Sequence, residues 1–168
     1  MDIVLRPWSL NDLDDLVKHA NNFNIAKYMG NIFPHPYTVE DAKAFIEMAA
    51  TSFPIHIFAI TLNGKAIGGI GVHPKNDIMQ KNAELGYWLA EPYWGKGIAT
   101  KAITQIVPFA FSILDITRIY AIAFGNNLAS QRVLEKCGFQ LEAHFHKTIF
   151  KNGEFLDELF YAFRKQNS

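Results

Sequence analysis

The sequence of 168 residues contains a single cysteine, Cys137, so an internal disulfide framework is excluded. It also has no excess of charge, because 16 Lys and Arg residues balance 16 Asp and Glu residues. A protein that holds nucleic acid by electrostatic attraction needs a basic excess or a basic stripe. We therefore expect no nucleic-acid partner.

Long hydrophobic runs are missing as well. The longest uncharged helical stretch, 102–114, is too short and too polar to span a bilayer. The first residues show no basic lead followed by an apolar core, so no secretion signal is predicted. These observations predict a cytoplasmic protein with no membrane partner.

Apolar residues are abundant by contrast. Hydrophobic residues make up 49% of the sequence and aromatic residues 14%, which is enough to bury a core in a chain of this length. No internal repeat, low-complexity tract or linker interrupts the pattern. Residues 1–168 are therefore expected to form a single domain.

Hydrophobic periodicity predicts the order of the secondary-structure elements. Strands are expected at 3–5, 55–62, 65–72, 83–89, 118–124, 140–150 and 155–163. Helices are expected after the capping residues Ser9 and Thr38, and at 97–114 and 128–137. The order β-α-α-β-β-β-α-β-α-β-β predicts an α/β (α+β) fold. Its sheet is expected to be mixed and mostly antiparallel, with helices on both faces and one right-handed parallel β-α-β crossover.

The segment 91–102 shows the clearest chemical pattern. It lies between a predicted strand and a predicted helix, and positions 95, 97 and 99 are small residues. Small residues let a ligand approach the backbone, and the first turn of a helix offers free N–H groups and a positive dipole end. The segment therefore predicts an anion site, most often for phosphate, near Lys96 and Lys101. A tight turn without a ligand is the alternative interpretation.

Two other phosphate-binding motifs do not match this segment. A P-loop needs four residues between its first glycine and the Gly-Lys pair, followed by Ser or Thr, and the run Gly95-Lys96-Gly97-Ile98 lacks that spacing. The dinucleotide fingerprint needs a third glycine near position 100, where this chain has Thr100.

A second segment, 127–139, reads Asn-Leu-Ala-Ser-Gln-Arg-Val-Leu-Glu-Lys-Cys-Gly-Phe. With the first segment, it resembles the GNAT superfamily of N-acetyltransferases, specifically the RimJ/RimL-like subgroup of ribosomal-protein N-terminal acetyltransferases. The family pattern Gln/Arg-x-x-Gly-x-Gly/Ala is filled by Trp94, Gly97 and Ala99. The second segment fits Asn-x-x-Ser/Ala followed by a helix and Gly-Phe. Because the opening 5–8 also fits, the resemblance covers nearly the whole chain.

The resemblance implies that acetyl-CoA (coenzyme A) is the cofactor. Its pyrophosphate would be held by backbone amides of the first segment, namely those of Gly95, Lys96, Gly97, Ala99 and Thr100. Its pantetheine arm would lie as a pseudo-strand beside the end of strand 83–89, at Tyr87, Trp88 and Leu89. Trp94 stands where much of the superfamily has Gln or Arg, a substitution that the subgroup tolerates.

The second segment would supply the remaining cofactor contacts. By resemblance, Asn127 would hydrogen-bond the pantetheine arm, and Ser130 would lie near the thioester sulfur. Arg132 and Lys136 are candidates for the nucleotide phosphates. Many GNAT enzymes have a general-acid tyrosine seven residues after the asparagine, where this chain has Leu134. Ser130 or a water molecule would then protonate the leaving thiolate.

A base is expected to assist the reaction, because an amine attacks a thioester only in its neutral form. Glu84 is the candidate, acting through water, since the family commonly places a glutamate on this strand; a surface carboxylate is the alternative interpretation. Asp157 and Glu158 are further candidates, as bases or as anchors for a cationic substrate. As neighbours on a strand they point to opposite faces, so one of them at most can line the site.

The loop 33–37 resembles the substrate-side loop of the subgroup. Its aromatic and imidazole side chains, Phe33, His35 and Tyr37, are candidates for the wall of an acceptor pocket, and two prolines stiffen it. A rigid connector between helices is the alternative. His144 and His146 share one strand face, but no carboxylate or cysteine partner is evident, so no metal site is expected.

The interpretation is an acetyl-CoA-dependent N-acetyltransferase that works by direct attack in a ternary complex. The acceptor would be a primary amine: a peptide N-terminus, a polyamine or an amino sugar. A catalytically inert domain that binds coenzyme A as a sensor or interaction module is the alternative. Either a monomer or a homodimer is compatible with the sequence.

Overall fold

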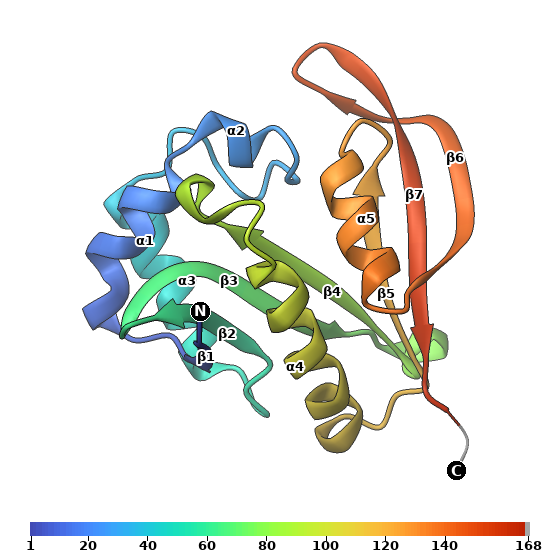
Figure 1. Ribbon diagram of the computed structural model, residues 1–168, viewed down its shortest axis with the longest axis horizontal. Coiled ribbons are helices and arrows are strands. Elements are labelled where there is room, and N and C mark those ends of the chain that lie inside the picture. The colour runs from blue at the N-terminus through green and yellow to red at the C-terminus, as the bar shows by residue number, and fades with distance from the viewer. Residues whose placement is uncertain (167–168) are drawn as a thin grey trace. The chain divides into compact units, whose positions relative to one another are not determined.

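The computed structural model describes residues 1–166, and the predicted elements occur in it in the predicted order (Figure 1). The strands are β1 (Ile3–Pro7), β2 (Ile57–Leu62), β3 (Lys65–Pro74), β4 (Asn82–Leu89), β5 (Arg118–Phe124), β6 (Gln140–Lys151) and β7 (Glu154–Arg164). The helices are α1 (Leu13–Ala20), α2 (Phe23–Ala26), α3 (Val39–Thr51), α4 (Ile98–Ile113) and α5 (Leu128–Lys136). Three short 3₁₀ helices are η1 (Leu10–Asp12), η2 (Asp77–Met79) and η3 (Glu91–Tyr93).

Within residues 1–166, seven strands form one sheet in the order β1-β2-β3-β4-β5-β7-β6. Strands β4 and β5 pair in parallel and are joined by α4, whereas β1–β2, β2–β3, β5–β7 and β6–β7 pair antiparallel. The prediction of a mixed, mostly antiparallel sheet with one parallel crossover is therefore confirmed.

Local signals explain several element boundaries. Thr38 caps α3, because its hydroxyl accepts the Asp41 N–H at 3.2 Å while the Asp41 carboxylate accepts the Thr38 N–H at 2.8 Å. Both hairpins turn on Asn-Gly pairs with positive φ, Asn63-Gly64 and Asn152-Gly153. Gly138, with φ of 88°, follows the end of α5 as predicted.

Two local features differ from the prediction. The helix expected after Ser9 begins as the 3₁₀ turn η1, and α1 itself starts at Leu13. The one-turn helix α2 was not predicted, because four residues are too few to show a helical period. It is capped by the Asn22 side chain, whose oxygen accepts the Asn24 N–H at 2.8 Å.

The chain divides into two compact units, one formed by residues 1–71 and 87–102 and the other by residues 72–86 and 103–168. Strands β3 and β4 and helix α4 each contribute residues to both units. The expected single domain over 1–168 stays a prediction.

Each unit buries apolar side chains of its own. In the first unit, α1 and α3 lie together beside β1 and β2 (Figure 1), and its core includes Trp8, Leu16, Ile25, Tyr37, Ile46, Ile57 and Trp88. In the second unit, the buried residues include Val72, Ile103, Ile106, Ile119, Leu134, Leu159 and Tyr161.

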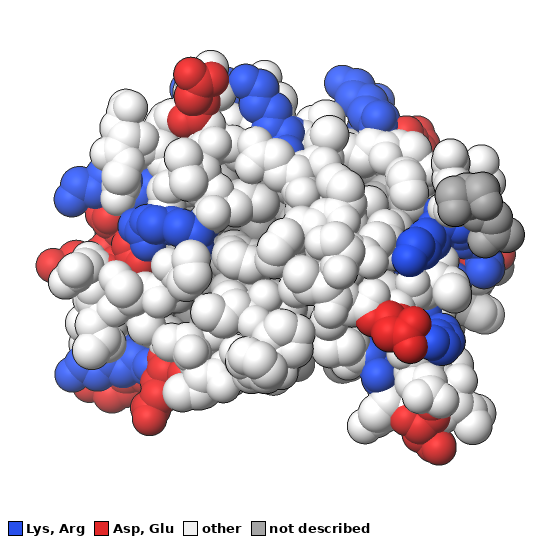
Figure 2. Space-filling model, turned by 90° about the horizontal axis from the view of Figure 1, so that it is seen from below, with Lys and Arg blue, Asp and Glu red and all other residues white. Residues whose placement is uncertain are grey.

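Charged side chains of both signs lie close to one another. On the face drawn in Figure 2, Lys and Arg side chains stand in small groups beside Asp and Glu side chains. In the second unit, for example, Lys81 pairs with Asp115 at 2.6 Å and Arg118 with Glu142 at 3.0 Å. Among residues 1–166, no helix combines the length and the apolar character that a membrane crossing requires.

One buried ion pair ties the first strand to the first helix. The guanidinium of Arg6 donates to both carboxylate oxygens of Asp12, at 2.8 and 2.7 Å, and Asp12 is only 2% exposed. The same carboxylate accepts the Ser9 N–H at 3.0 Å. Burial raises the pKa of Asp12, but the hydrogen bonds from Arg6 and Ser9 and the charge of Arg6 outweigh it, so the pKa lies below its ordinary value.

We predict that Asp12→Asn lowers the free energy of unfolding at neutral pH by about 2–3 kcal/mol, because it leaves Arg6 without its charge partner and removes a capping interaction. Because folding depresses the pKa of Asp12, its stabilisation is complete above the ordinary pKa of 3.8 and is lost as the pH falls below that value. Urea denaturation at neutral pH and near pH 3 should show a difference that shrinks in acid. Asp14→Asn, at an exposed position, is the control, and an equal loss for both variants would contradict the assignment.

Candidate active site

The turn between β4 and α4 places two glycines directly before the N-terminus of a helix. Gly95 and Gly97 have φ of 71° and 75°, a region that glycine enters without strain. The Lys101 N–H donates to the Gly97 carbonyl at 3.1 Å, which begins the hydrogen-bond ladder of α4, and the first N–H groups of a helix have no partner within the helix. A Cβ atom built on either glycine meets nothing within 4 Å. Free donors, a helix dipole and open space together suit an anion.

Trp94 holds this turn against the end of β4. Its indole N–H donates to the Leu89 carbonyl at 2.7 Å, and its own backbone N–H donates to the Glu91 carbonyl at 3.1 Å. The Ala90 N–H in turn donates to the Ile67 carbonyl of β3 at 2.8 Å. Sequence reasoning treated Trp94 only as a departure from the family pattern and missed this positioning role.

The two lysines of the segment differ in their surroundings. The Lys96 ammonium lies 5.7 Å from the centre of the Tyr93 ring and stays beside the turn. The Lys101 ammonium instead donates to the Met1 carbonyl at 2.8 Å. Lys96 is therefore the better placed of the two cations for a phosphate at the turn.

The end of β4 is packed tightly against β3. A Cβ on Gly68 would lie 2.5 Å from the Trp88 carbonyl oxygen, and one on Gly69 would lie 2.7 Å from the Trp88 indole nitrogen. Trp88 and Leu89 are both buried, whereas Tyr87 is half-buried. Glycines in β3 therefore permit the close approach that places the residues just before the turn.

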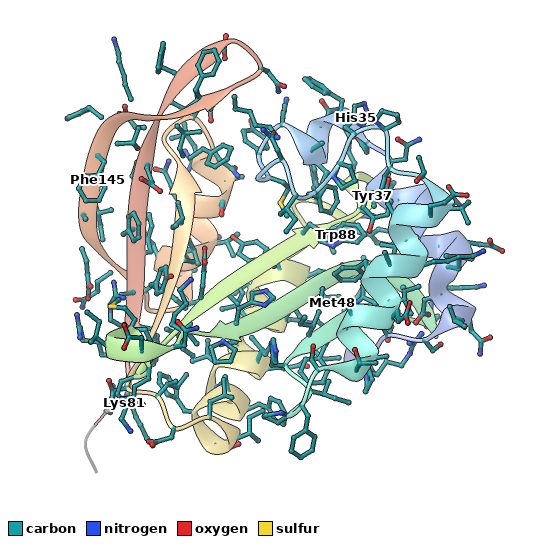
Figure 3. The ribbon with its side chains drawn as sticks, turned by 180° about the vertical axis from the view of Figure 1, so that it is seen from behind. His35, Tyr37, Met48, Lys81, Trp88 and Phe145 are labelled. Carbon is teal, nitrogen blue, oxygen red and sulfur yellow. The ribbon has the colours of Figure 1, made fainter. Side chains whose placement is uncertain are left out.

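The predicted acceptor loop is divided between core and surface. Tyr37 is 5% exposed, and burial raises the pKa of its hydroxyl to about 12. Phe33 packs between the rings of Tyr37 and Trp88, with centroids 5.3 and 5.8 Å away. His35 is exposed beside Phe23, at the outer edge of this unit in Figure 3. The role of the loop in acceptor binding stays a prediction, with His35 its most accessible side chain and Tyr37 part of the core.

A surface pocket of about 380 Å³ that was not predicted lies between the end of α1 and η3, and it is lined by Lys18, His19, Asn21, Asn22, Glu91 and Pro92. Its carboxylate is Glu91, which accepts from the Asn22 amide at 2.7 Å and the Asn24 amide at 3.1 Å. These hydrogen bonds lower the pKa of Glu91. Burial, followed by the nearby charge of Lys18, lowers the pKa of His19.

Glu84, the predicted base, belongs to a polar group in the second unit. Its carboxylate lies 3.8 Å from the Lys75 ammonium, and its register partner on β5 is Tyr120. A hydrogen bond with Tyr120, and then the charge of Glu84, raise the pKa of Lys75. The parallel pairing of β4 with β5 includes Glu84 opposite Tyr120 as its last residue pair, and both strands continue beyond it. Lys75, on the loop before β4, and Tyr120, on β5, were not identified from the sequence.

The start of α5 holds the second motif. Asn127 caps this helix, because its side-chain oxygen accepts the Ser130 N–H at 3.3 Å. Both side chains are half-buried, and Arg132 and Lys136 are exposed. Leu134, at the position of the family tyrosine, is completely buried, so it is a core residue of this unit.

Asp157 lies on β7 opposite two histidines of β6. The Nε2 atom of His144 lies 2.8 Å from the Asp157 Oδ2 atom, and the Nδ1 atom of His146 lies 3.4 Å from the same oxygen. The hydrogen bond with His144 and the backbone N–H of Lys147 lower the pKa of Asp157 to about 2. The expectation that the histidine pair has no carboxylate partner is therefore wrong, because strand pairing brings in Asp157.

Comparisons with known proteins show the family of this chain. Residues 2–140 match the acetyltransferase (GNAT) domain family. "Uncharacterized N-acetyltransferase YoaA" of Bacillus subtilis (strain 168) is 38% identical over 101 residues, 59% of this chain and 55% of that protein. Spermidine N(1)-acetyltransferase of Escherichia coli (strain K12) is 26% identical over 160 residues, 91% of this chain and 81% of that protein. This chain thus spans about half the length of YoaA and most of the spermidine enzyme.

Solved structures show the same fold. The crystal structure of the microcin C7 self immunity acetyltransferase MccE, in complex with acetyl-CoA and AMP, superposes with a TM-score of 0.84 at 26% sequence identity. The superposition covers 98% of this chain and 93% of that one.

We predict that Gly68→Ala lowers the free energy of unfolding by about 1–3 kcal/mol, because the new methyl group would overlap the Trp88 carbonyl and force the two strands apart. Chemical denaturation measures the loss. Gly30→Ala is the matched control, since a Cβ there meets its nearest atom, on Ile32, at 4.0 Å. Equal stability of the Gly68 variant and the wild type would show that β3 does not restrain the end of β4.

Proposed function

Because this chain belongs to the GNAT acetyltransferase family, we propose that it transfers the acetyl group of acetyl-CoA to a primary amine in a ternary complex. The observation that carries the proposal is the glycine turn at the start of α4, where the Cβ positions of Gly95 and Gly97 meet open space beside a helix N-terminus. A pyrophosphate offers the charge and the acceptor oxygens that such a turn binds.

The cofactor assignments follow from this placement. The pyrophosphate is held by backbone amides of the turn, and the Lys96 side chain adds positive charge. The amides are those of Gly95, Lys96, Gly97, Ala99 and Thr100. The backbone of Tyr87, Trp88 and Leu89 accompanies the pantetheine arm. Asn127 keeps its amide N–H groups for the same arm, since its oxygen already caps α5. Arg132 and Lys136 bind nucleotide phosphates.

The reaction joins the acceptor nitrogen to the acetyl carbonyl carbon. The amine lone pair attacks that carbon, the C–S bond breaks, and its electron pair leaves on sulfur as the thiolate. The nitrogen then loses a proton, which Glu84 takes through water, and Lys75 stays positively charged beside the carboxylate. Because Leu134 has no proton to donate and is buried, the thiolate receives its proton from Ser130 or from water.

The acceptor is a primary amine in this proposal. Spermidine, named for one relative, is a polyamine of this class. We place the chain in the RimJ/RimL-like subgroup because of the segment 5–8 and of Trp94. A peptide N-terminus is therefore the second acceptor to test. Asp157 is the proposed anchor for a cationic acceptor, since its low pKa keeps it negatively charged at neutral pH. Acetyl-CoA turnover with peptides, polyamines and aminoglycosides identifies the acceptor.

We predict that Gly97→Glu weakens coenzyme A binding about 100-fold or more, because a carboxylate in the turn repels the pyrophosphate and fills its space. Isothermal titration calorimetry measures the affinity.

The matched control is Gly153→Glu in the β6–β7 turn. Gly153 has φ of 78° and open space around its Cβ position, as Gly97 does, so both variants carry a similar backbone strain of about 1–2 kcal/mol. Wild-type affinity of the Gly97 variant would refute the phosphate placement.

We also predict that Glu84→Gln slows turnover at low pH by about 100-fold and leaves coenzyme A affinity intact. The defect should shrink at higher pH, because more of the acceptor amine is then already neutral. A pH–rate profile of kcat/KM measures this dependence.

Glu154→Gln, an exposed carboxylate on β7, is the control for the removal of one negative charge. If the Glu84 and Glu154 variants share the wild-type profile, the base is another group.

A further inference from the structure

Three potential metal ligands converge on the β6–β7 hairpin. The side chains of His144, His146 and Asp157 each offer one ligand atom, and these atoms all lie within 4.8 Å of one another. The two imidazole rings are 4.7 Å apart between centroids. Both histidines are exposed and Asp157 is half-buried, so solvent reaches the group.

Strand register and a β-bulge shape this group together: His144 pairs with Leu159, two residues from Asp157 on the same strand face. The register of β6 against β7 shifts between Phe145 and Ile149, and Lys147 within the shift has a positive φ of 53°. Since Phe145 pairs with Glu158 and Ile149 with Leu156, Asp157 alone faces the bulged residues. The bulge lies beside the carboxylate, and its residue Lys147 donates a backbone N–H to Asp157.

The carboxylate is oriented from two further directions. Its Oδ1 atom accepts the Lys147 N–H at 2.9 Å, which leaves the Oδ2 atom for the histidines. On its other side Asp157 packs against Gly125, where any Cβ would lie 2.8 Å from the Asp157 Cβ. A hydrogen bond to the second oxygen of a carboxylate is the outer-shell support that metal ligands usually have.

We propose that His144, His146 and Asp157 bind a zinc ion, which would occupy the carboxylate otherwise proposed as the anchor of a cationic acceptor. Two imidazole nitrogens and one carboxylate oxygen are ligands that zinc prefers, and three protein ligands leave a fourth position for water.

The two histidine–aspartate distances are close to those that zinc requires, and the three ligand atoms all lie within 4.8 Å of one another. Zinc bonds of about 2.0–2.1 Å place tetrahedral ligand atoms about 3.3 Å apart. The two histidine–aspartate distances are 2.8 and 3.4 Å, so His146 is already at that spacing and His144 must withdraw by about half an ångström. Rotation about side-chain bonds of exposed residues achieves this without moving the strands.

Zinc binding also explains why two histidines point at one oxygen. His144 lies at hydrogen-bond distance from Oδ2, 2.8 Å, whereas His146 is 3.4 Å from the same oxygen. The second histidine, 80% exposed in its side chain, gains little from a longer contact with the same atom. A zinc ion uses both nitrogens equally.

The test is zinc titration of the full, untagged chain after removal of metals by chelation. We expect one zinc ion per chain by calorimetry, and His144→Ala, His146→Ala and Asp157→Asn should each weaken binding about 10- to 100-fold or more. Cobalt, used as a spectroscopic probe, should give the visible absorption of a tetrahedral complex with the wild type and lose it in the three variants.

Two matched variants control for surface binding. His73→Ala removes another exposed histidine of the same unit, and Glu158→Gln removes the neighbouring carboxylate, which accepts from the Thr148 hydroxyl at 3.1 Å. Both should bind zinc as the wild type does. The proposal is overturned if the wild type binds no zinc at micromolar concentrations, or if the three ligand variants bind it as tightly as the two controls. Circular dichroism of each variant separates loss of binding from loss of folding.

Discussion

The glycine turn at the N-terminus of α4 is the feature on which the proposed chemistry depends. A helix cannot satisfy its own first N–H groups, and here two glycines with positive φ keep side chains away from them. The Trp94 indole and the Ala90 amide hold the turn to β4 and β3 from either side. Preformed donors of this kind bind an anion without first ordering a loop, so the cofactor keeps more of its binding energy.

Close packing within the first unit supports the position of this turn. Gly68 and Gly69 let β3 approach Trp88, and Trp88 contacts Phe33 of the proposed acceptor loop. The same aromatic core therefore supports the end of β4 and the loop that follows α2. Residues that touch neither substrate can influence both, because packed cores transmit displacement rather than absorb it.

The β6–β7 hairpin holds a second group of polar side chains, made of His144, His146 and Asp157, beside a β-bulge. A regular ladder would set one residue of β6 opposite Asp157, whereas the bulge sets several there. The carboxylate near two imidazoles can hold a cation of either kind, a metal ion or a protonated amine. The proposed anchor for a cationic acceptor and the proposed zinc ligand are the same atom, so the two occupants would compete.

The sequence by itself determined the elements and the glycine turn before α4, because capping boxes, Asn-Gly hairpins and glycines act over a few neighbouring residues. Only the tertiary structure decided which side chains and backbone groups the site residues contact. Asp157 meets His144 through strand register, Glu84 meets Lys75 across neighbouring strands, and Trp94 reaches back to a carbonyl. Periodicity tells which face of a strand a residue occupies, but not which residue of the next strand stands opposite, and a bulge changes that register without a strong local signal.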